Sequence, residues 1–196
     1  IGSCLEFDIF YQDNKFNVYH PPMDDKGFEL SKYLDFISYK QPQLWLDAKN
    51  IFVPGACQAL IETIDRAKIP PKNYFVEFPP ETKFDDPVVQ QCAQSFSQKG
   101  IQSSYYLNPA DFDACVEGKA NDQARCHSFN KNIQALTYLK VVNNVSFDKS
   151  LMQIVQADQR FDQFDFNSWA FYPFELVSIT NKNEGKYKRL IYRNHY

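Results

Sequence analysis

Glu6 and Asp8 form the first chemically informative pattern in the sequence, because a single apolar residue separates them. Side chains on a β-strand alternate between its two faces. On a strand the two carboxylates would therefore share one face, while Leu5, Phe7 and Ile9 would share the other. Two carboxylates this close repel each other unless a cation or a proton lies between them. The pattern predicts a site for a divalent metal ion.

Asp47 and Lys49 repeat this spacing, and His20 ends a short apolar segment between the two patterns. Three carboxylates supply the oxygen ligands that Mg²⁺ or Ca²⁺ prefers. The metal ion and a lysine would together neutralise a phosphate, and histidine transfers protons near neutral pH. We therefore expect Glu6, Asp8 and Asp47 to bind the metal ion, and His20 and Lys49 to be catalytic.

Each of these patterns also has a structural explanation that needs no chemistry. The acidic pair near the N-terminus fits a solvated edge strand. Asp47 and Lys49 fit a salt bridge inside the fold, and His20 fits a surface or capping histidine. The sequence alone leaves both explanations open.

Three further residues are candidates for substrate binding. Glu77 lies in another short strand-like segment and would act either as a fourth ligand or as a partner of Lys49. Trp169 and Tyr172 belong to an aromatic cluster that follows a predicted strand. Such a cluster packs in a core or forms an aromatic wall for a lipid headgroup or acyl chain.

The elements that must position these residues alternate between short strands and helices. We expect strands near residues 5–9, 44–49, 74–78, 101–107, 145–148, 164–167 and 189–194, and helices near 28–38, 56–67, 87–99, 128–139 and 148–156. Alternation predicts a parallel sheet with helices outside it. The prediction is one α/β domain over residues 1–196, a TIM-type (β/α) barrel that is incomplete or lacks its first strand. An open doubly wound sheet is the alternative, although its usual glycine-rich first turn is missing.

Three segments resemble the phosphatidylinositol-phospholipase-C-like phosphodiesterases, a superfamily that includes glycerophosphodiester phosphodiesterases and spider-venom-type sphingomyelinase D enzymes. They are Leu5-Glu6-Phe7-Asp8, His20-Pro21-Pro22 and Leu46-Asp47-Ala48-Lys49-Asn50-Ile51. Their residues are most similar to those of the menorin branch. The resemblance spans residues 2–52.

This resemblance implies a barrel, with Glu6, Asp8 and Asp47 as metal ligands, His20 as a catalytic histidine and Lys49 as the base that faces the phosphate. The resemblance also implies a second histidine on a preceding strand. In this chain His195 would fill that role only if the last strand closed the barrel beside the first. The chain also has His-Pro where His-Asp is common.

Composition and cysteine content limit the class of protein. The chain is 44% hydrophobic with a formal charge of −3, so it has no strongly basic surface for nucleic acid. No apolar run is long enough to span a bilayer. The chain opens on Ile1, and we expect a product from which a leader has been removed.

The cysteines bear on the compartment in which the protein folds. Cys115 and Cys126 bracket a polar segment and predict a disulfide-closed loop, hence a secreted or periplasmic protein. The alternative is free thiols in the cytoplasm. The five cysteines are an odd number, so one of them lies outside any disulfide within the chain, and Cys4 is the candidate.

The expected function is that of a metal-dependent phosphodiesterase acting on a glycerophosphodiester or a phospholipid headgroup, with peripheral contact to a membrane. It would be a hydrolase, or a lyase that forms a cyclic phosphate. The alternative is a non-catalytic secreted binding protein derived from a barrel.

Overall fold

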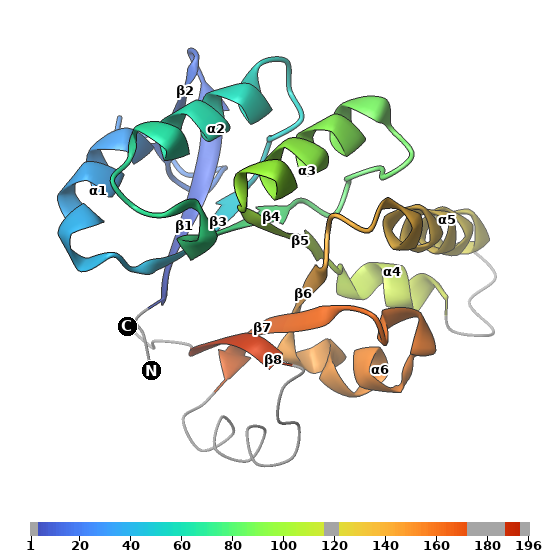
Figure 1. Cartoon of the computed structure of the whole chain (residues 1–196). Coiled ribbons are helices and arrows are strands. Elements are labelled where there is room, and N and C mark those ends of the chain that lie inside the picture. Colours follow the sequence, from blue (N-terminus) through green and yellow to red (C-terminus); the bar gives the residue numbers. More distant parts are fainter. Residues whose placement is uncertain (1–3, 116–121, 172–186, 193–196) are drawn as a thin grey trace. The chain divides into compact units, whose positions relative to one another are not determined.

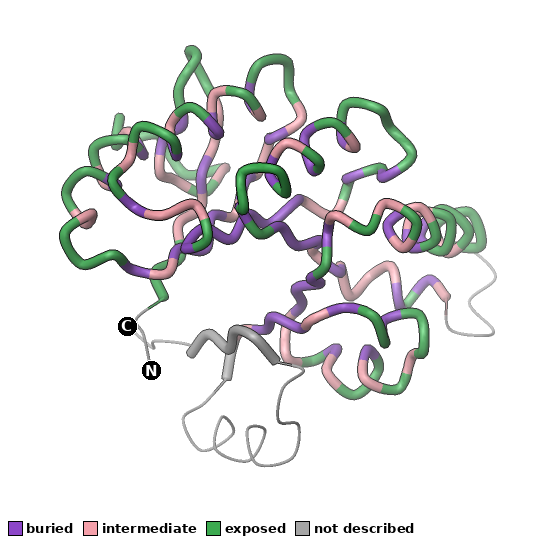
Figure 2. The backbone as a smooth tube through the Cα atoms, in the orientation of Figure 1, coloured by how far each residue is buried: buried purple, intermediate pink, exposed green. Residues whose placement is uncertain are grey.

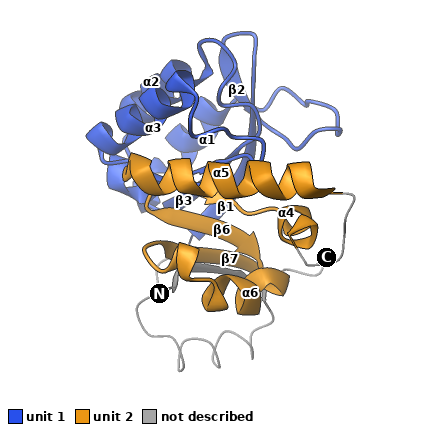
Figure 3. Ribbon diagram, turned by 90° about the vertical axis from the view of Figure 1, so that its right-hand side faces the viewer, with its two compact units in different colours: residues 1–104 blue, residues 105–196 orange. Residues whose placement is uncertain are grey.

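The computed structural model describes residues 4–115, 122–171 and 187–192 of the chain. The chain divides into two compact units, residues 1–104 and 105–196 (Figure 3). The expectation of one domain over residues 1–196 stays a prediction.

Unit 1 alternates strands and helices after an initial hairpin (Figure 1). Its elements are β1 (Cys4–Gln12), β2 (Lys15–Val18), α1 (Leu30–Ile37), β3 (Gln43–Ala48), α2 (Ala56–Arg66), β4 (Tyr74–Phe78) and α3 (Pro87–Lys99). Short 3-10 helices at Ser38–Lys40 and Pro71–Asn73 precede β3 and β4. Strand β5 (Gln102–Tyr106) spans the boundary with unit 2.

The strands of unit 1 combine parallel and antiparallel pairing. Strand β1 is parallel to β3, and β3 is parallel to β4. Strand β2 instead runs antiparallel to β1 over Ile9–Gln12. The two-residue turn between them, Asp13 and Asn14, has positive φ angles of 51° and 60°. This backbone is that of the tight hairpin turns that match the twist of paired strands.

The apolar face of these strands packs against helices (Figure 1). Phe7 of β1 lies with its ring centroid 5.7 Å from that of Tyr33 in α1. On the same face, Phe78 of β4 lies 6.0 Å from Phe96 of α3. Figure 2 shows that burial is concentrated along the strands and the inner sides of the helices. Part of the core of unit 1 therefore lies between this face of the sheet and its helices. Trp45 and Phe75 are buried on the opposite face, where their ring centroids lie 4.9 Å apart.

Local sequence signals set the ends of α3. The Asp86 side chain caps the first turn by accepting a hydrogen bond of 2.8 Å from the Val88 N–H. Pro87 occupies the first helical position, where its missing N–H costs nothing. Gly100 ends the helix in the left-handed conformation. The predicted bounds of this helix, residues 87–99, are confirmed.

Unit 2 contains the remaining helices and strands. They are α4 (Pro109–Ala114), α5 (Gln123–Leu139), β6 (Asn144–Asp148), α6 (Met152–Ala157), β7 (Asp165–Phe171) and β8 (Tyr187–Tyr192). Strands β6, β7 and β8 pair in parallel, with register shifts between β7 and β8. The core of the unit contains aromatic pairs. The ring centroids of Phe112 and Phe129 lie 5.0 Å apart, and those of Phe147 and Phe166 lie 5.5 Å apart.

The prediction of a TIM-type barrel is wrong. The strands follow the order β2-β1-β3-β4-β5-β6-β7-β8, and no pairing among the described residues closes the sheet. The physical reason lies in the hairpin. A barrel needs a strand against the outer edge of β1, but β2 folds back and occupies that edge from Ile9 to Gln12. The chain is α/β with an open sheet of mixed pairing.

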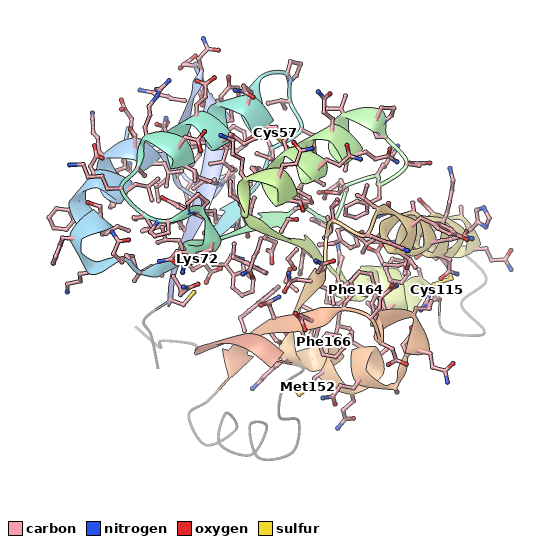
Figure 4. The ribbon with its side chains drawn as sticks, in the orientation of Figure 1. Cys57, Lys72, Cys115, Met152, Phe164 and Phe166 are labelled. Atoms are coloured by element: carbon pink, nitrogen blue, oxygen red, sulfur yellow. A yellow bond between two sulfur atoms is a disulfide. The ribbon has the colours of Figure 1, made fainter. Side chains whose placement is uncertain are left out.

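Two disulfides cross-link the chain, one in each unit. Cys57 and Cys92 join α2 to α3, and Figure 4 shows Cys57 on the side of α2 that faces α3. Cys115 and Cys126 join the end of α4 to α5, as predicted. Cys4 is exposed in β1 and belongs to neither bond. Disulfides of this kind are consistent with folding in an oxidising compartment.

None of the helices in the described part of the chain combines the length and the apolar character that crossing a bilayer requires.

Candidate functional site

Acidic side chains line one face of the sheet in unit 1. Asp8 of β1 is in register with Asp47 of β3, and Asp47 is in register with Glu77 of β4. Glu6 lies two residues before Asp8, so it shares the same face. Phe7 points the other way and contacts α1. The carboxylates therefore lie on the face opposite the one that the helices cover, and we call these four acids the carboxylate row.

Lys49 lies one residue beyond the end of β3 and contacts two members of the row. Its ammonium group forms an ion pair of 2.9 Å with Asp8 Oδ1 and donates a short hydrogen bond to Asp47 Oδ2. The side chains are only 23% exposed for Lys49 and 16% exposed for Asp47. Burial alone would lower the pKa of Lys49, but these two carboxylates raise it above its usual value. Lys49 is therefore held in its charged form.

One lysine does not neutralise Glu6, Asp8 and Asp47. Burial raises the pKa of Asp47, and the bond from Lys49 offsets only part of this effect. The pKa of Glu6 is also raised, because surrounding protein displaces water from its carboxyl and because Asp8 and Asp47 repel a further negative charge. These three acids therefore carry more negative charge than Lys49 balances, and a cation or a proton would relieve the excess.

His20 approaches the row from the hairpin side. It is exposed, lies two residues after β2 and precedes the cis Pro21–Pro22 bond. Its carbonyl accepts a 3.0 Å hydrogen bond from the Met23 N–H, which forms a turn. Burial is the largest influence on the pKa of Asp47 and raises it, whereas the charge of His20 acts to lower this pKa. An exposed imidazole within electrostatic reach of a carboxylate has the freedom to exchange protons with a ligand.

Asn50 is a site residue that the sequence reasoning treated only as part of a motif. Its carboxamide makes two hydrogen bonds to the backbone of Tyr11: it accepts from the N–H at 2.7 Å and donates to the carbonyl at 2.9 Å. The available signal is an asparagine directly after the strand predicted over residues 44–49, where its amide can replace a backbone partner.

The three predicted substrate-binding residues belong to different parts of the chain. Glu77 belongs to the carboxylate row and is buried, with 4% of its surface exposed. Trp169 lies in β7 of unit 2, where its ring packs 5.4 Å from Tyr106. Tyr172 lies outside the described residues, as does His195.

The donor set of the row suits a hard divalent cation. Glu6, Asp8 and Asp47 offer only oxygen ligands, which Mg²⁺ and Ca²⁺ prefer. In residues 4–115, 122–171 and 187–192, no three His, Cys, Asp or Glu side chains are arranged to hold a metal ion as they stand. A cation would have to draw the carboxylates together and take over the charge that Lys49 now balances. The residue types and the excess charge fit a metal ion.

Comparison with known proteins does not assign the chain: no family model matches it, and no curated protein matches it.

Proposed function

We propose that the carboxylate row of unit 1 is the site of a metal-dependent phosphodiesterase that acts on a glycerophosphodiester or a phospholipid headgroup. The observation that carries this proposal is the partly neutralised set of in-register acids beside one charged lysine. Phosphoryl chemistry needs positive charge around the phosphate, and acids in excess recruit that charge as a metal ion.

Each residue of the site has a role in this proposal. Glu6, Asp8 and Asp47 hold Mg²⁺ or Ca²⁺, which when bound supplies positive charge to the phosphate oxygens. From its place beside Asp8 and Asp47, Lys49 stabilises the negative charge that develops on the phosphate. His20 carries a proton to the leaving oxygen or takes one from the nucleophile. That nucleophile is water, or a neighbouring substrate hydroxyl that yields a cyclic phosphate.

Two independent features support this assignment. The segments that contain Glu6, His20 and Asp47 resemble the phospholipase-C-like phosphodiesterases in residue type and order. The two disulfides fit a secreted or periplasmic enzyme, where lipid headgroups at a membrane surface are accessible.

Hydrolysis of bis-p-nitrophenyl phosphate, with and without Mg²⁺ or Ca²⁺, tests the proposal. Glu6→Ala and His20→Ala should each lose activity, His20→Ala by about 100-fold because it removes a proton-transfer group. Glu81→Gln and His127→Ala are the matched controls, since both residues are exposed and outside the row. Equal turnover by wild type and by the two site variants would reject the enzyme.

A non-catalytic binding protein is the second candidate, and one observation favours it. Lys49 already pairs with both Asp8 and Asp47, as a permanent structural ion network would require. In that case Ca²⁺ would leave thermal stability unchanged, and wild type would show no turnover above buffer. Metal-dependent stabilisation without turnover would indicate a metal-binding module instead of an enzyme.

A further inference from the structure

After β3 ends, the chain stays beside β1, because the side chain of Asn50 hydrogen-bonds to the backbone of β1. Strand β3 ends at Ala48, and the backbone N–H of Lys49 still donates to the Ile9 carbonyl at 3.0 Å. At the next residue, the backbone pairing is replaced by the carboxamide of Asn50. This group satisfies both the N–H and the carbonyl of Tyr11, so it acts as one more rung of the ladder.

These contacts fix the backbone of Lys49 on both sides. Ile9 holds its N–H, and the pair formed by Asn50 and Tyr11 holds the following residue. Lys49 forms an ion pair with Asp8 of β1, the strand to which Asn50 is hydrogen-bonded. A lysine side chain is long and loses rotamer entropy when it is immobilised. A fixed backbone therefore decides where its ammonium group can reach.

Tyr11 is itself held by the segment that follows Asn50. Gly55 has φ of +84°, and a Cβ atom there would lie 3.1 Å from the Tyr11 hydroxyl. Only glycine combines this conformation with this close approach. The side chain of Tyr11 therefore reaches the start of α2, and Lys49 and Asn50 of the connection from β3 to α2 hydrogen-bond to β1.

We infer that Asn50 is a positioning residue: through its paired hydrogen bonds to the Tyr11 backbone it places the Lys49 ammonium group between Asp8 and Asp47. The role of Lys49 toward phosphate rests on the proposed function, whereas the placement of Lys49 does not. Asn50 touches neither the carboxylates nor, in this proposal, the substrate.

The test replaces Asn50 and follows Lys49 directly. In a crystal structure of Asn50→Ala, the Lys49 ammonium group should lie beyond ion-pair distance of Asp8 and Asp47, because its backbone is no longer held beside β1. Asn50→Gln keeps the carboxamide on a longer arm and should fold as wild type while displacing the ammonium group less. With bis-p-nitrophenyl phosphate as substrate, kcat of Asn50→Ala should fall by about tenfold or more.

Asn73→Ala is the matched control. Asn73 is a buried asparagine that donates to the carbonyls of Gln41 and Pro42, at the opposite end of β3. Its replacement should lower the melting temperature about as much and leave Lys49 paired with Asp8 and Asp47. Lys49 still paired with both aspartates in Asn50→Ala would overturn the inference. Absence of hydrolysis in wild type would reject only the enzyme, since the position of Lys49 is determined without substrate.

Discussion

At the scale of single residues, Glu6 is where the excess charge of the carboxylate row is most open to experiment. Its pKa is raised by the protein around it and by Asp8 and Asp47, so the folded state holds its proton more tightly than the unfolded chain does. Stability is then lost as pH rises through the folded pKa. Glu6→Gln removes this penalty. The variant should therefore be more stable than wild type at neutral pH without divalent cations, by less than about 1 kcal/mol because solvent screens an exposed group.

Thermal denaturation in EDTA measures the stability gained without a metal ion, and denaturation in Ca²⁺ measures the stabilisation lost with the ligand. At acidic pH the advantage of Glu6→Gln should disappear, since wild-type Glu6 is then protonated in both states. In Ca²⁺, wild type should gain stability and the variant should gain less, because a ligand is missing. Glu81 is exposed and outside the row, so Glu81→Gln should show neither effect. A stabilised variant that still responds fully to Ca²⁺ would remove Glu6 from the ligand set.

Alternation along a strand was enough to place Glu6 and Asp8 on one face, and Asp47 and Lys49 on another strand's face. The sequence could not supply the register between strands, which puts Asp8 beside Asp47 and Asp47 beside Glu77. Nor could it supply the Asn50 contacts, which join positions 39 residues apart. Such contacts depend on where strands meet in space and leave no local periodicity.

At the scale of elements, the hairpin of β1 and β2 decides the fold of unit 1. Asp13 and Asn14 both adopt positive φ, which costs about 1 kcal/mol for most residues and less for Asn, Asp or Gly. Asn14→Ala should therefore destabilise the protein by about 1 kcal/mol. Asn14→Gly, its matched control, should be neutral or stabilising, although it loses the exposed 3.3 Å bond from the Tyr11 hydroxyl. Urea denaturation distinguishes the two, and equal stabilities would contradict the hairpin geometry.

The same turn explains why the barrel was predicted and is absent. Helix positions followed from apolar periodicity, and α1, α2 and α3 lie within two residues of the predicted bounds. The strands predicted from the sequence leave out β2, so their alternation with helices indicates parallel pairing throughout. The two-residue Asp-Asn turn between alternating segments is the hairpin signal that outweighs it. A sheet closes into a barrel only if its two edge strands can pair, and the residue pattern of each strand does not reveal whether they can.

At the scale of the whole molecule, each compact unit has its own covalent cross-link. Cys57–Cys92 spans 35 residues within unit 1, and Cys115–Cys126 spans 11 residues within unit 2. Neither disulfide crosses from one unit to the other. A cross-link stabilises mainly by restricting the unfolded chain, by about 4 kcal/mol for the longer separation and about 3 kcal/mol for the shorter.

Removal of one disulfide should therefore loosen one unit at a time. In Cys57→Ala/Cys92→Ala, hydrogen exchange followed by mass spectrometry should accelerate in α2, α3 and the strands of unit 1, while residues 122–171 keep their protection. Cys115→Ala/Cys126→Ala should give the reverse pattern with a smaller loss. The reason is that each pair restricts only the segment between its own cysteines. Acceleration in both units from either double variant would show that they unfold as a single cooperative body, because local opening would then require the whole chain to open.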